Sequence, residues 1–427
     1  MRKQKSVAIV GAGIFGLSLA TVLREKGYEV TVFDQHQYDE TEYQPGLDGR
    51  VQVASVDENK IFRASYGTKL HYQRLALESR QEWASLNELR KNGLPESEKR
   101  EQDELFVGCG MLRVQPTEEL GDLEKETLAN MEREGLRHTQ FVKSNQSDRD
   151  RAVSTGWDSK LLEFSIPDGS SKSFEAMATI KGVKFRLGPQ AGAFESLVEE
   201  RIPDPTLKRA LGLTTKDGTF HKADVVVIAA GSFTTQLLPD MSYHLESSAG
   251  SIVTFKIDKE NAQLWEKYSP ERFPVITWKS APRDSAGKDT GSVYVFPRTP
   301  EGLVKIGYRG IKFTNFQPAP EGCPFSQDGQ WSVPLPPEQS SSIPAPADDA
   351  IRRFVSIFLP EFKDMPFHST KLCWYTDSLD NSFVIDYVPT YAEKSVFVCT
   401  GGSGHGAKFL PVLGKVNATL ETLASVH

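Results

Sequence analysis

Residues 7–34, VAIVGAGIFGLSLATVLREKGYEVTVFD, decide the fold of this chain. The four apolar residues 7–10 predict a buried strand, and residues 17–26 carry apolar side chains at helical spacing. Residues 28–33 predict a second strand that ends at an acidic residue. A strand, a glycine-rich turn, a helix and a second strand form the first unit of a doubly wound α/β domain.

The glycines of the turn predict a ligand site. Gly11 permits the tight turn, Gly13 lets the backbone approach a pyrophosphate, and Gly16 lets helix and strand touch. The helix N-terminus offers unpaired N–H groups to phosphates, and Asp34 can accept from a ribose hydroxyl. A glycine-rich turn without a ligand is the alternative, and the surrounding elements favour a dinucleotide, either NAD or FAD. The turn residues are Gly11, Gly13, Ile14, Phe15 and Gly16.

Composition excludes several classes of protein. The chain has 427 residues, 38% of them hydrophobic and 25% charged, and a formal net charge of −7. A chain of this length predicts two domains. Its negative charge argues against nucleic acid or an anionic membrane as partner. No apolar run approaches the roughly 20 residues of a membrane helix.

Cysteine usage and the chain ends bear on compartment. The four cysteines show no C-x-x-C pair and no metal-type spacing, so we expect reduced thiols and no metal site. We find no signal peptide, and residues 425–427 (SVH) do not match the peroxisomal signal S-K-L. We therefore expect a cytoplasmic protein.

Periodicity predicts the remaining elements. The expected helices are residues 70–89, 120–137, 195–201 and 348–359. The expected strands are residues 105–114, 182–188, 223–231, 292–296, 303–308 and 395–400, with a hairpin at 211–220. Residues 251–308 alternate in polarity, which predicts an antiparallel sheet in the second domain. Residues 35–50 are expected to form a loop, and the eight prolines of residues 318–346 predict an irregular surface excursion.

Five further blocks carry a family resemblance. They are residues 59–63 (NKIFR), 304–307 (VKIG), 371–377 (KLCWYTD), 383–386 (FVID) and 401–411 (GGSGHGAKFLP). With the N-terminal motif, and in this order, they resemble the monomeric sarcosine oxidase family of FAD-dependent amine oxidases. That family includes pipecolate and saccharopine oxidases and the fungal fructosyl amino acid oxidases, or amadoriases.

The resemblance implies the cofactor and the architecture. The cofactor is expected to be FAD, joined through its 8α carbon to the sulfur of Cys373, which from spacing alone would be an ordinary buried thiol. The expected fold is α/β plus antiparallel β, with a Rossmann-type FAD-binding domain interleaved with a substrate domain on a mixed or antiparallel sheet. The FAD-binding domain is expected at residues 1–92, 174–240 and 365–427, and the substrate domain at 93–173 and 241–364. A monomer is expected.

The resemblance also implies a substrate site. Arg63 and Lys408 match two residues that hold a substrate carboxylate, for which a guanidinium provides a bidentate fork. Fructosyl amino acid oxidases often lack an arginine at the Arg63 position, which favours the sarcosine and pipecolate side. Tyr375 matches an active-site tyrosine. Arg309 departs from the histidine of the sarcosine branch, and we expect it to contact the substrate.

Other residues match flavin contacts. Lys305 matches the lysine that activates oxygen over the flavin, where a fixed positive charge stabilises negative charge on oxygen. Lys60 replaces an arginine on the flavin face, and His405 matches a histidine near the flavin. Together with Asp34, Cys373, Lys408 and the turn residues above, the expected cofactor contacts are Lys60, Val183, Ala230, Gly231, Gly402, Gly404, His405 and Gly406.

The sequence therefore predicts an FAD-dependent oxidase of an N-alkyl or cyclic amino acid. Hydride transfer to the flavin would give an imine, and O₂ would be reduced to H₂O₂, with Lys305, Lys60, Tyr375, Arg63 and Lys408 in the catalytic site. Alternatives are a fructosyl amino acid oxidase or a fungal oxidase that cyclises an N-methyl amino acid. Outside this class stand an NAD-linked dehydrogenase and a flavin-binding protein without turnover.

Overall fold

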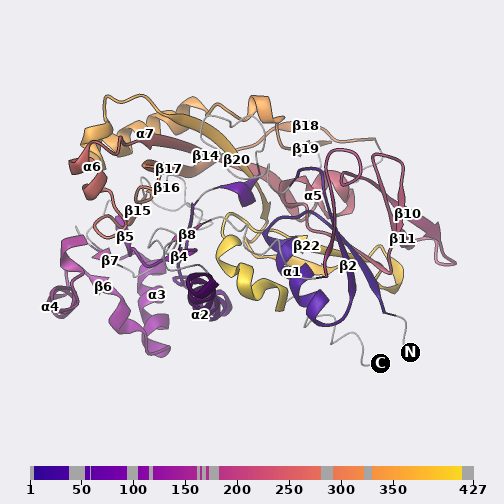
Figure 1. Ribbon diagram of the computed structural model, residues 1–427, viewed down its shortest axis with the longest axis horizontal. Helices are drawn as coiled ribbons and strands as arrows, with labels where there is room; N and C mark the ends of the chain where they lie inside the picture. Colours follow the sequence, from indigo (N-terminus) through magenta and orange to yellow (C-terminus); the bar gives the residue numbers. More distant parts are fainter. Residues whose placement is uncertain are drawn as a thin grey trace.

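The structure, a computed structural model, describes residues 4–37, 53–57, 59–93, 104–114, 119–160, 164–165, 170–172, 182–279, 292–321 and 329–415. Two six-stranded sheets dominate the described chain and lie side by side (Figure 1). This arrangement agrees with the predicted α/β plus antiparallel β class.

The first sheet is the predicted dinucleotide-type sheet. It is parallel except where β21 pairs with β22. Along β1, Val7 and Ile9 enter one hydrophobic cluster with helix α1, whereas Ala8 and Val10 enter another. Both faces are therefore buried, as expected for a parallel sheet. Its order is β21 (Val384–Tyr387), β22 (Val396–Thr400), β13 (Val225–Ile228), β1 (Ser6–Val10), β2 (Glu29–Asp34) and β9 (Lys184–Leu187).

Helix α1 (Ile14–Glu25) follows the glycine turn as predicted. Its buried residues include Phe15, Leu19 and Leu23, which recur at helical spacing and pack on β1. Gly27 then takes a φ of +86° after the helix end, a conformation that favours glycine.

The second sheet is the predicted mixed sheet. All its pairings are antiparallel except that of β15 with β5. Its order is β20 (Ser369–Ser378), β14 (Leu245–Lys256), β17 (Leu303–Phe313), β16 (Ser292–Val295), β15 (Val275–Lys279) and β5 (Met111–Val114). Because β20 belongs here and β21 and β22 belong to the first sheet, residues 369–400 of the expected FAD-domain segment 365–427 contribute to both sheets.

Helix α7 (Ala345–Phe358) covers the second sheet (Figure 1). Its Ile351 and Phe354 are fully buried in one cluster with Val253 and Phe255 of β14. The helix starts three residues before the predicted 348 because Pro346 occupies its first turn, where the missing N–H has no intrahelical partner to lose.

The remaining helices and strands lie outside these two sheets and the two helices described above. The other helices are α2 (Leu70–Gly93), α3 (Asp122–Arg133), α4 (Gln146–Ser154), α5 (Thr234–Leu237) and α6 (Ala262–Lys267). The other strands are β3 (Asn59–Ile61), β4 (Phe106–Val107), β6 (Phe141–Val142), β7 (Phe164–Ser165), β8 (Ser170–Lys172), β10 (Phe194–Arg201), β11 (Lys208–Thr215), β12 (Phe220–Lys222), β18 (Phe316–Pro318) and β19 (Gln330–Ser332).

The helix predicted at 195–201 is wrong, because this segment is strand β10. It pairs antiparallel with β11, and Arg209 forms a 3.0 Å ion pair with Glu200 directly across the ladder. Cross-strand pairing of charges supports this half-exposed strand, whereas its run of charged residues is also compatible with a helix. The neighbouring hairpin of β11 and β12 around Gly218 is confirmed.

Three other predictions need adjustment. The helix at 120–137 ends at Arg133, and Gly135 follows with a φ of +73°. The strand at 105–114 is interrupted into β4 and β5. Residues 318–346 are less irregular than predicted, because β18 and β19 pair across them and Ser332 and Ser340 are buried. Residues 322–328, and residues 38–50 of the predicted loop, lie outside the described residues.

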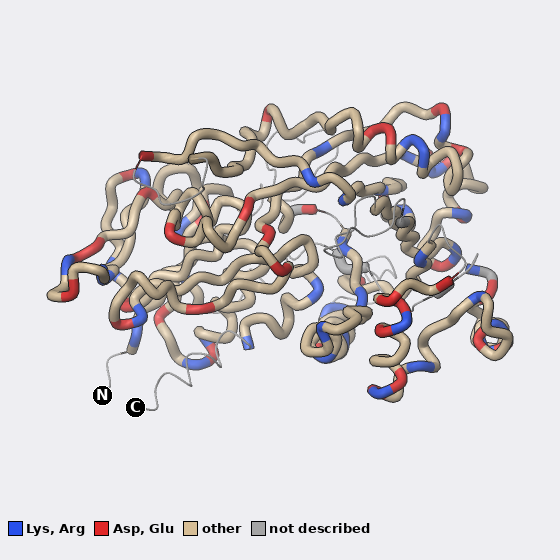
Figure 2. The backbone as a smooth tube through the Cα atoms, turned by 180° about the vertical axis from the view of Figure 1, so that it is seen from behind, with Lys and Arg blue, Asp and Glu red and all other residues tan. Residues whose placement is uncertain are grey.

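Charges are dispersed over the molecule. In the rear view of Figure 2, basic and acidic positions are interspersed along the backbone. Among the helices that the structure describes, none is long and apolar enough to cross a membrane.

Candidate active site

The glycine turn leaves no room for side chains. A Cβ at Gly11 would lie 2.4 Å from the Ala229 carbonyl oxygen, and one at Gly16 would lie 2.0 Å from the Gly11 carbonyl oxygen. Gly11 also has a φ of +107° and donates from its backbone N–H to the Phe33 carbonyl at 2.8 Å. The turn therefore keeps the N-terminus of α1 at the carboxyl edge of the sheet, where a pyrophosphate can approach its N–H groups.

Asp34 lies at this edge beside the turn. Its Oδ2 accepts a 2.8 Å hydrogen bond from the Ala12 N–H, and its Oδ1 accepts from the His36 N–H at 2.9 Å. These bonds fix the orientation of the carboxylate, and each oxygen keeps a lone pair for another donor. A contact with a ribose hydroxyl stays a prediction that this geometry permits.

Of three other predicted cofactor contacts, two lie at the same edge of the sheet as the glycine turn and one lies at the opposite edge. Ala230 and Gly231 follow β13 at the same carboxyl edge, where Gly231 has a φ of +53°. Val183 precedes β9 at the opposite edge, because Lys184 pairs with Thr31 and Leu187 pairs with Asp34. The structure thus does not bring Val183 to the turn. The neighbour of Asp34 is Gly188, which donates to its carbonyl oxygen at 3.0 Å and which sequence reasoning missed.

Phe15 joins the N-terminal turn to the C-terminal glycine segment. Its ring would lie 3.1 Å from a Cβ at Gly402 and 3.0 Å from one at Gly406, and Ile14 also approaches Gly406. The glycines of residues 401–406 thus let the chain pass directly over the start of α1. This contact brings together two predicted segments that are almost 400 residues apart.

A cavity of about 1360 Å³ lies beside these segments. It is bordered by residues of β14, β16, β17 and β20, and by the segments around residues 54–63 and 404–408. Eight predicted site residues line it: Lys60, Arg63, Arg309, Cys373, Tyr375, Gly404, His405 and Lys408.

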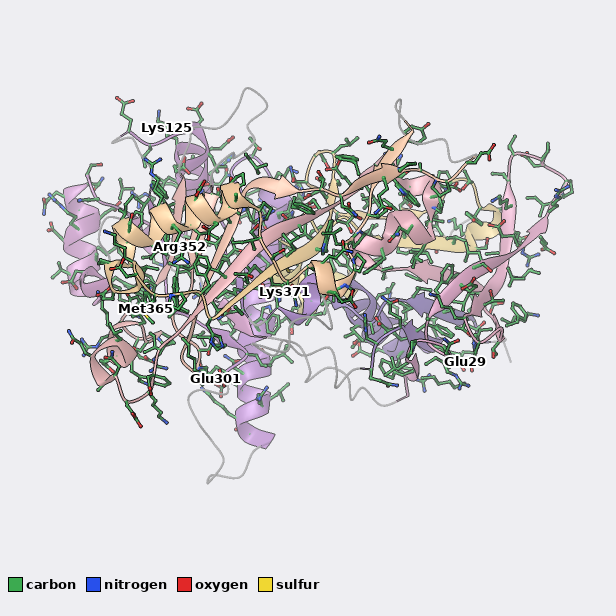
Figure 3. All side chains as sticks on the ribbon, turned by 90° about the horizontal axis from the view of Figure 1, so that it is seen from above. Glu29, Lys125, Glu301, Arg352, Met365 and Lys371 are labelled. Atoms are coloured by element: carbon green, nitrogen blue, oxygen red, sulfur yellow. The ribbon has the colours of Figure 1, made fainter. Side chains whose placement is uncertain are left out.

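Side chains alternate along β20, and one face of the strand borders the cavity. Lys371, Cys373, Tyr375 and Asp377 share one face of the strand because successive side chains point to opposite sides. Figure 3 shows Lys371 near the middle of the molecule, between Glu29 of β2 on one side and Met365 on the other. Cys373 is buried, and its partner on β14 is Gly250.

Lys305 is held by a residue that sequence reasoning missed. Its Nζ donates to Asp57 Oδ2 at 2.8 Å and also to the Asn59 carbonyl oxygen. Lys60 donates from its Nζ to the main-chain carbonyl of Asp57. Asp57 lines the cavity, whereas Lys305 is 1% exposed. The predicted catalytic lysine is therefore buried in an ion pair with Asp57, and Asp57 is the partner that lines the cavity.

This cluster shifts its members' pKa values. Burial would raise the pKa of Asp57, but the positive charges of Lys305 and Lys60 outweigh it and the pKa is lowered. Burial lowers the pKa of Lys60 to about 8, against the opposing attraction of Asp57. Burial, with the nearby Asp57 charge, raises the pKa of Cys373 to about 11.

Arg63 and Lys408 meet on the ring of Tyr66. The guanidinium carbon of Arg63 lies 4.8 Å from the ring centroid, and Lys408 Nζ lies 5.0 Å from it. Lys408 also donates to Tyr66 Oη at 2.8 Å. Trp83 of α2 fixes the backbone of Lys408 by donating from Nε1 to its carbonyl at 2.8 Å. The two predicted carboxylate contacts are thus brought together.

His405 completes a directional chain of hydrogen bonds. Its Nε2 lies 2.9 Å from the Asn381 carbonyl oxygen, which can only accept, so Nε2 carries the proton. Nδ1 of the neutral ring then accepts from Tyr66 Oη at 3.1 Å. Burial, with the positive charge of Lys408, holds the pKa of His405 well below its usual value. The ring is therefore neutral, and Tyr66 directs its own proton away from Lys408.

Arg309 and Tyr375 also line the cavity. The guanidinium carbon of Arg309 is 5.3 Å from the Tyr375 ring centroid. Its Nη2 donates to the Ser403 carbonyl at 3.0 Å and its Nη1 to the Gly404 carbonyl at 3.3 Å. Burial raises the pKa of Tyr375, so its hydroxyl stays protonated. Among the residues whose positions are described, no His, Cys, Asp and Glu cluster could hold a metal ion.

The chain belongs to the FAD dependent oxidoreductase family, whose model matches residues 6–420. It is 26% identical over 437 residues to L-saccharopine oxidase of Schizosaccharomyces pombe, covering 96% of this chain and 88% of that protein. It is 24% identical over 416 residues to human peroxisomal sarcosine oxidase, covering 96% and 90% of the two chains.

Solved structures support the fold. A modified fructosyl peptide oxidase of Aspergillus nidulans superposes with a TM-score of 0.76 at 24% identity, covering 99% of this chain and 91% of that one. The family makes FAD the cofactor, and the residues present fit it. The glycines let the turn pack closely at the N-terminus of α1, where a pyrophosphate can bind, and Cys373 lines the cavity.

Proposed function

We propose that this enzyme oxidises a secondary-amine amino acid, N-alkyl or cyclic, to an imine that hydrolyses or cyclises. Bound FAD would supply the two-electron oxidation, and O₂ would take up the two electrons with two protons to give H₂O₂. The single observation that carries the proposal is that Arg63 and Lys408, which both line the cavity, meet on the side chain of Tyr66. Two fixed cations on one side of a cavity are an anchor for a carboxylate.

The cavity also suits a neutral amine. Six cationic side chains line it, Lys60, Arg63, Arg113, Arg309, Lys312 and Lys408, against three carboxylates, Asp57, Glu246 and Asp377, among the residues that the structure describes. Like-charge repulsion lowers the pKa of an amine bound there, so its lone pair becomes available without a strong general base. The phenol of Tyr375 stays protonated and can orient the amine.

We propose that Cys373 holds the FAD through a thioether to the 8α carbon. Its sulfur lies at the cavity wall, where burial and the Asp57 charge raise its pKa and the positive charges of Lys371, Lys60 and Lys305 oppose that rise. We propose further that Lys305 provides the fixed positive charge for oxygen reduction. Asp57 and Asn59 hold its ammonium in one position, which preorganises the charge.

The proposal is tested by measuring peroxide from the purified holoenzyme with a panel of amines. The panel contains sarcosine, pipecolate, saccharopine, N-methyl aromatic amino acids and fructosyl-valine. We expect peroxide with at least one secondary-amine amino acid and weaker turnover of fructosyl-valine. Preferred oxidation of fructosyl-valine would support a fructosyl amino acid oxidase instead. Bound flavin with no peroxide from any amine would contradict the oxidase assignment.

A further inference from the structure

Strand β17 carries an irregularity beside the cavity. In its pairing with β14, Ser251 lies opposite Tyr308 and Ala249 lies opposite Phe313. Four residues of β17, 309–312, thus stand against Gly250 alone. Such a bulge redirects side chains, and bulges are common next to active sites.

The bulge aims two cations at Tyr375. Arg309 lies 5.3 Å and Lys312 lies 5.6 Å from the ring centroid of Tyr375. Gly250 lies against both side chains, since a Cβ there would be in van der Waals contact with Arg309 and Tyr375 at 3.7 Å. Both cations line the cavity.

The two cations differ in how their charge is balanced. Lys312 forms a 2.6 Å ion pair with Asp377. Arg309 donates to the carbonyl oxygens of Ser403 and Gly404 and lies against Tyr375, and among the described residues its Nε has no hydrogen-bond partner. No carboxylate among the described residues forms a salt bridge with Arg309, although the charge of Asp377, which pairs with Lys312, also acts on it. Arg309 is half-buried and lines the cavity, so its guanidinium can be reached by an anion that enters there.

Arg309 is also close to the anchor for the first carboxylate. The charges of Lys408, Arg63 and Arg309 all act on His405, in addition to its burial, to lower its pKa. One carboxylate between Arg63 and Lys408 leaves Arg309 without an anion in direct contact. The bound substrate is the group that enters this space.

We propose that Arg309 binds a second carboxylate of the substrate, carried by its side chain or its N-substituent. The inference rests on the proposed function and narrows it to acidic secondary-amine amino acids. A guanidinium fixed by two backbone carbonyls presents its remaining N–H edge to a planar anion, and a carboxylate matches this geometry.

Matched pairs of substrates test the second anion. Kcat/KM is measured for N-methyl-L-glutamate against N-methyl-L-glutamine, and for N-(2-carboxyethyl)glycine against its terminal amide. Each pair has nearly one shape and differs by one charge. We expect the acid to be favoured about tenfold or more in at least one pair. Equal values within both pairs would overturn the inference and leave the proposed function standing.

Two variants locate the effect. In Arg309→Gln we expect the acid-to-amide ratio to fall towards one. Arg113→Gln also removes a cation that lines the cavity, but this one is paired with Glu124 at 3.2 Å, so the ratio should persist. An equal loss in both variants would show a general electrostatic effect and overturn the role of Arg309.

A binding measurement keeps the test independent of turnover. Thermal unfolding of the holoenzyme is followed with succinate, glutarate and adipate and with their monoamides. We expect at least one diacid to raise the melting temperature more than its monoamide in the wild type, and the difference to vanish in Arg309→Gln. If no amine is oxidised, the proposed function fails, and this comparison alone decides for or against the second anion site.

Discussion

Lys408 Nζ donates a 2.8 Å hydrogen bond to Tyr66 Oη, although 342 residues separate the two in the chain. The same ring lies under the guanidinium of Arg63, and the same hydroxyl donates to His405. Tyr66 therefore holds both cations of the carboxylate anchor. Its role is positioning, because it supports the groups that bind the substrate.

The variant Tyr66→Phe removes the hydroxyl and keeps the ring, so it tests the hydroxyl alone. The ring under Arg63 remains, but Lys408 loses its acceptor, so we expect KM for the amino acid substrate to rise about tenfold with a smaller change in kcat. Tyr72→Phe is the matched control, since the Tyr72 hydroxyl accepts from the Phe383 N–H and supports no cation of the anchor. An equal rise in KM for both variants would indicate a general packing defect.

Cys373→Ala tests the flavin link. The wild type should keep a yellow chromophore in the protein pellet after acid precipitation, whereas the variant should release it to the supernatant. Cys399→Ala, which changes a buried thiol of β22 away from the cavity wall, should behave as the wild type. A colourless wild-type pellet would refute the thioether.

Lys305→Met should slow reoxidation of the reduced enzyme by O₂ about a hundredfold, because it removes a preorganised charge. The anaerobic rate of flavin reduction by substrate should change much less, and Lys305→Arg should restore part of the oxygen reaction. Stopped-flow absorbance measures both half-reactions separately. Loss of reduction with normal reoxidation would assign Lys305 to substrate oxidation instead.

The lowered pKa of Lys60 predicts that the free energy of unfolding depends on pH. Its pKa is about 8 in the folded protein and near 10.5 when unfolded, so between these values the unfolded state binds more protons and stability rises with pH. The free energy of unfolding of the wild type, relative to Lys60→Met, should increase by about 1.5 kcal/mol from pH 8 to pH 9.5. Denaturant titrations at the two pH values measure this difference. A constant or falling difference would contradict the lowered pKa.

The N-terminal unit could be predicted because its determinants are local. Gly16 contacts Gly11 and Ile9 of β1 within the same segment, and the helix and strands follow from the apolar pattern of that segment. The same holds for α2 and for β22. Local patterns failed at β10, where glutamates on a paired strand resemble a charged helix.

The active site could be predicted only in part. Family resemblance supplied Arg63, Lys408 and Cys373, which the structure places at one cavity. It did not supply Asp57, whose role depends on a partner 248 residues away. Nor did it supply the bulge at residues 309–312, because register in a sheet depends on the neighbouring strand.

The central claim, that the substrate is anchored by its carboxylate on Arg63 and Lys408, is tested most directly by anaerobic flavin bleaching. The best amine from the panel is compared with its carboxamide, in the wild type and in Lys408→Met. We predict that the acid bleaches the wild-type flavin at least tenfold faster, at subsaturating concentration, than the amide, and that Lys408→Met loses this preference. Equal bleaching by acid and amide in the wild type would contradict the account.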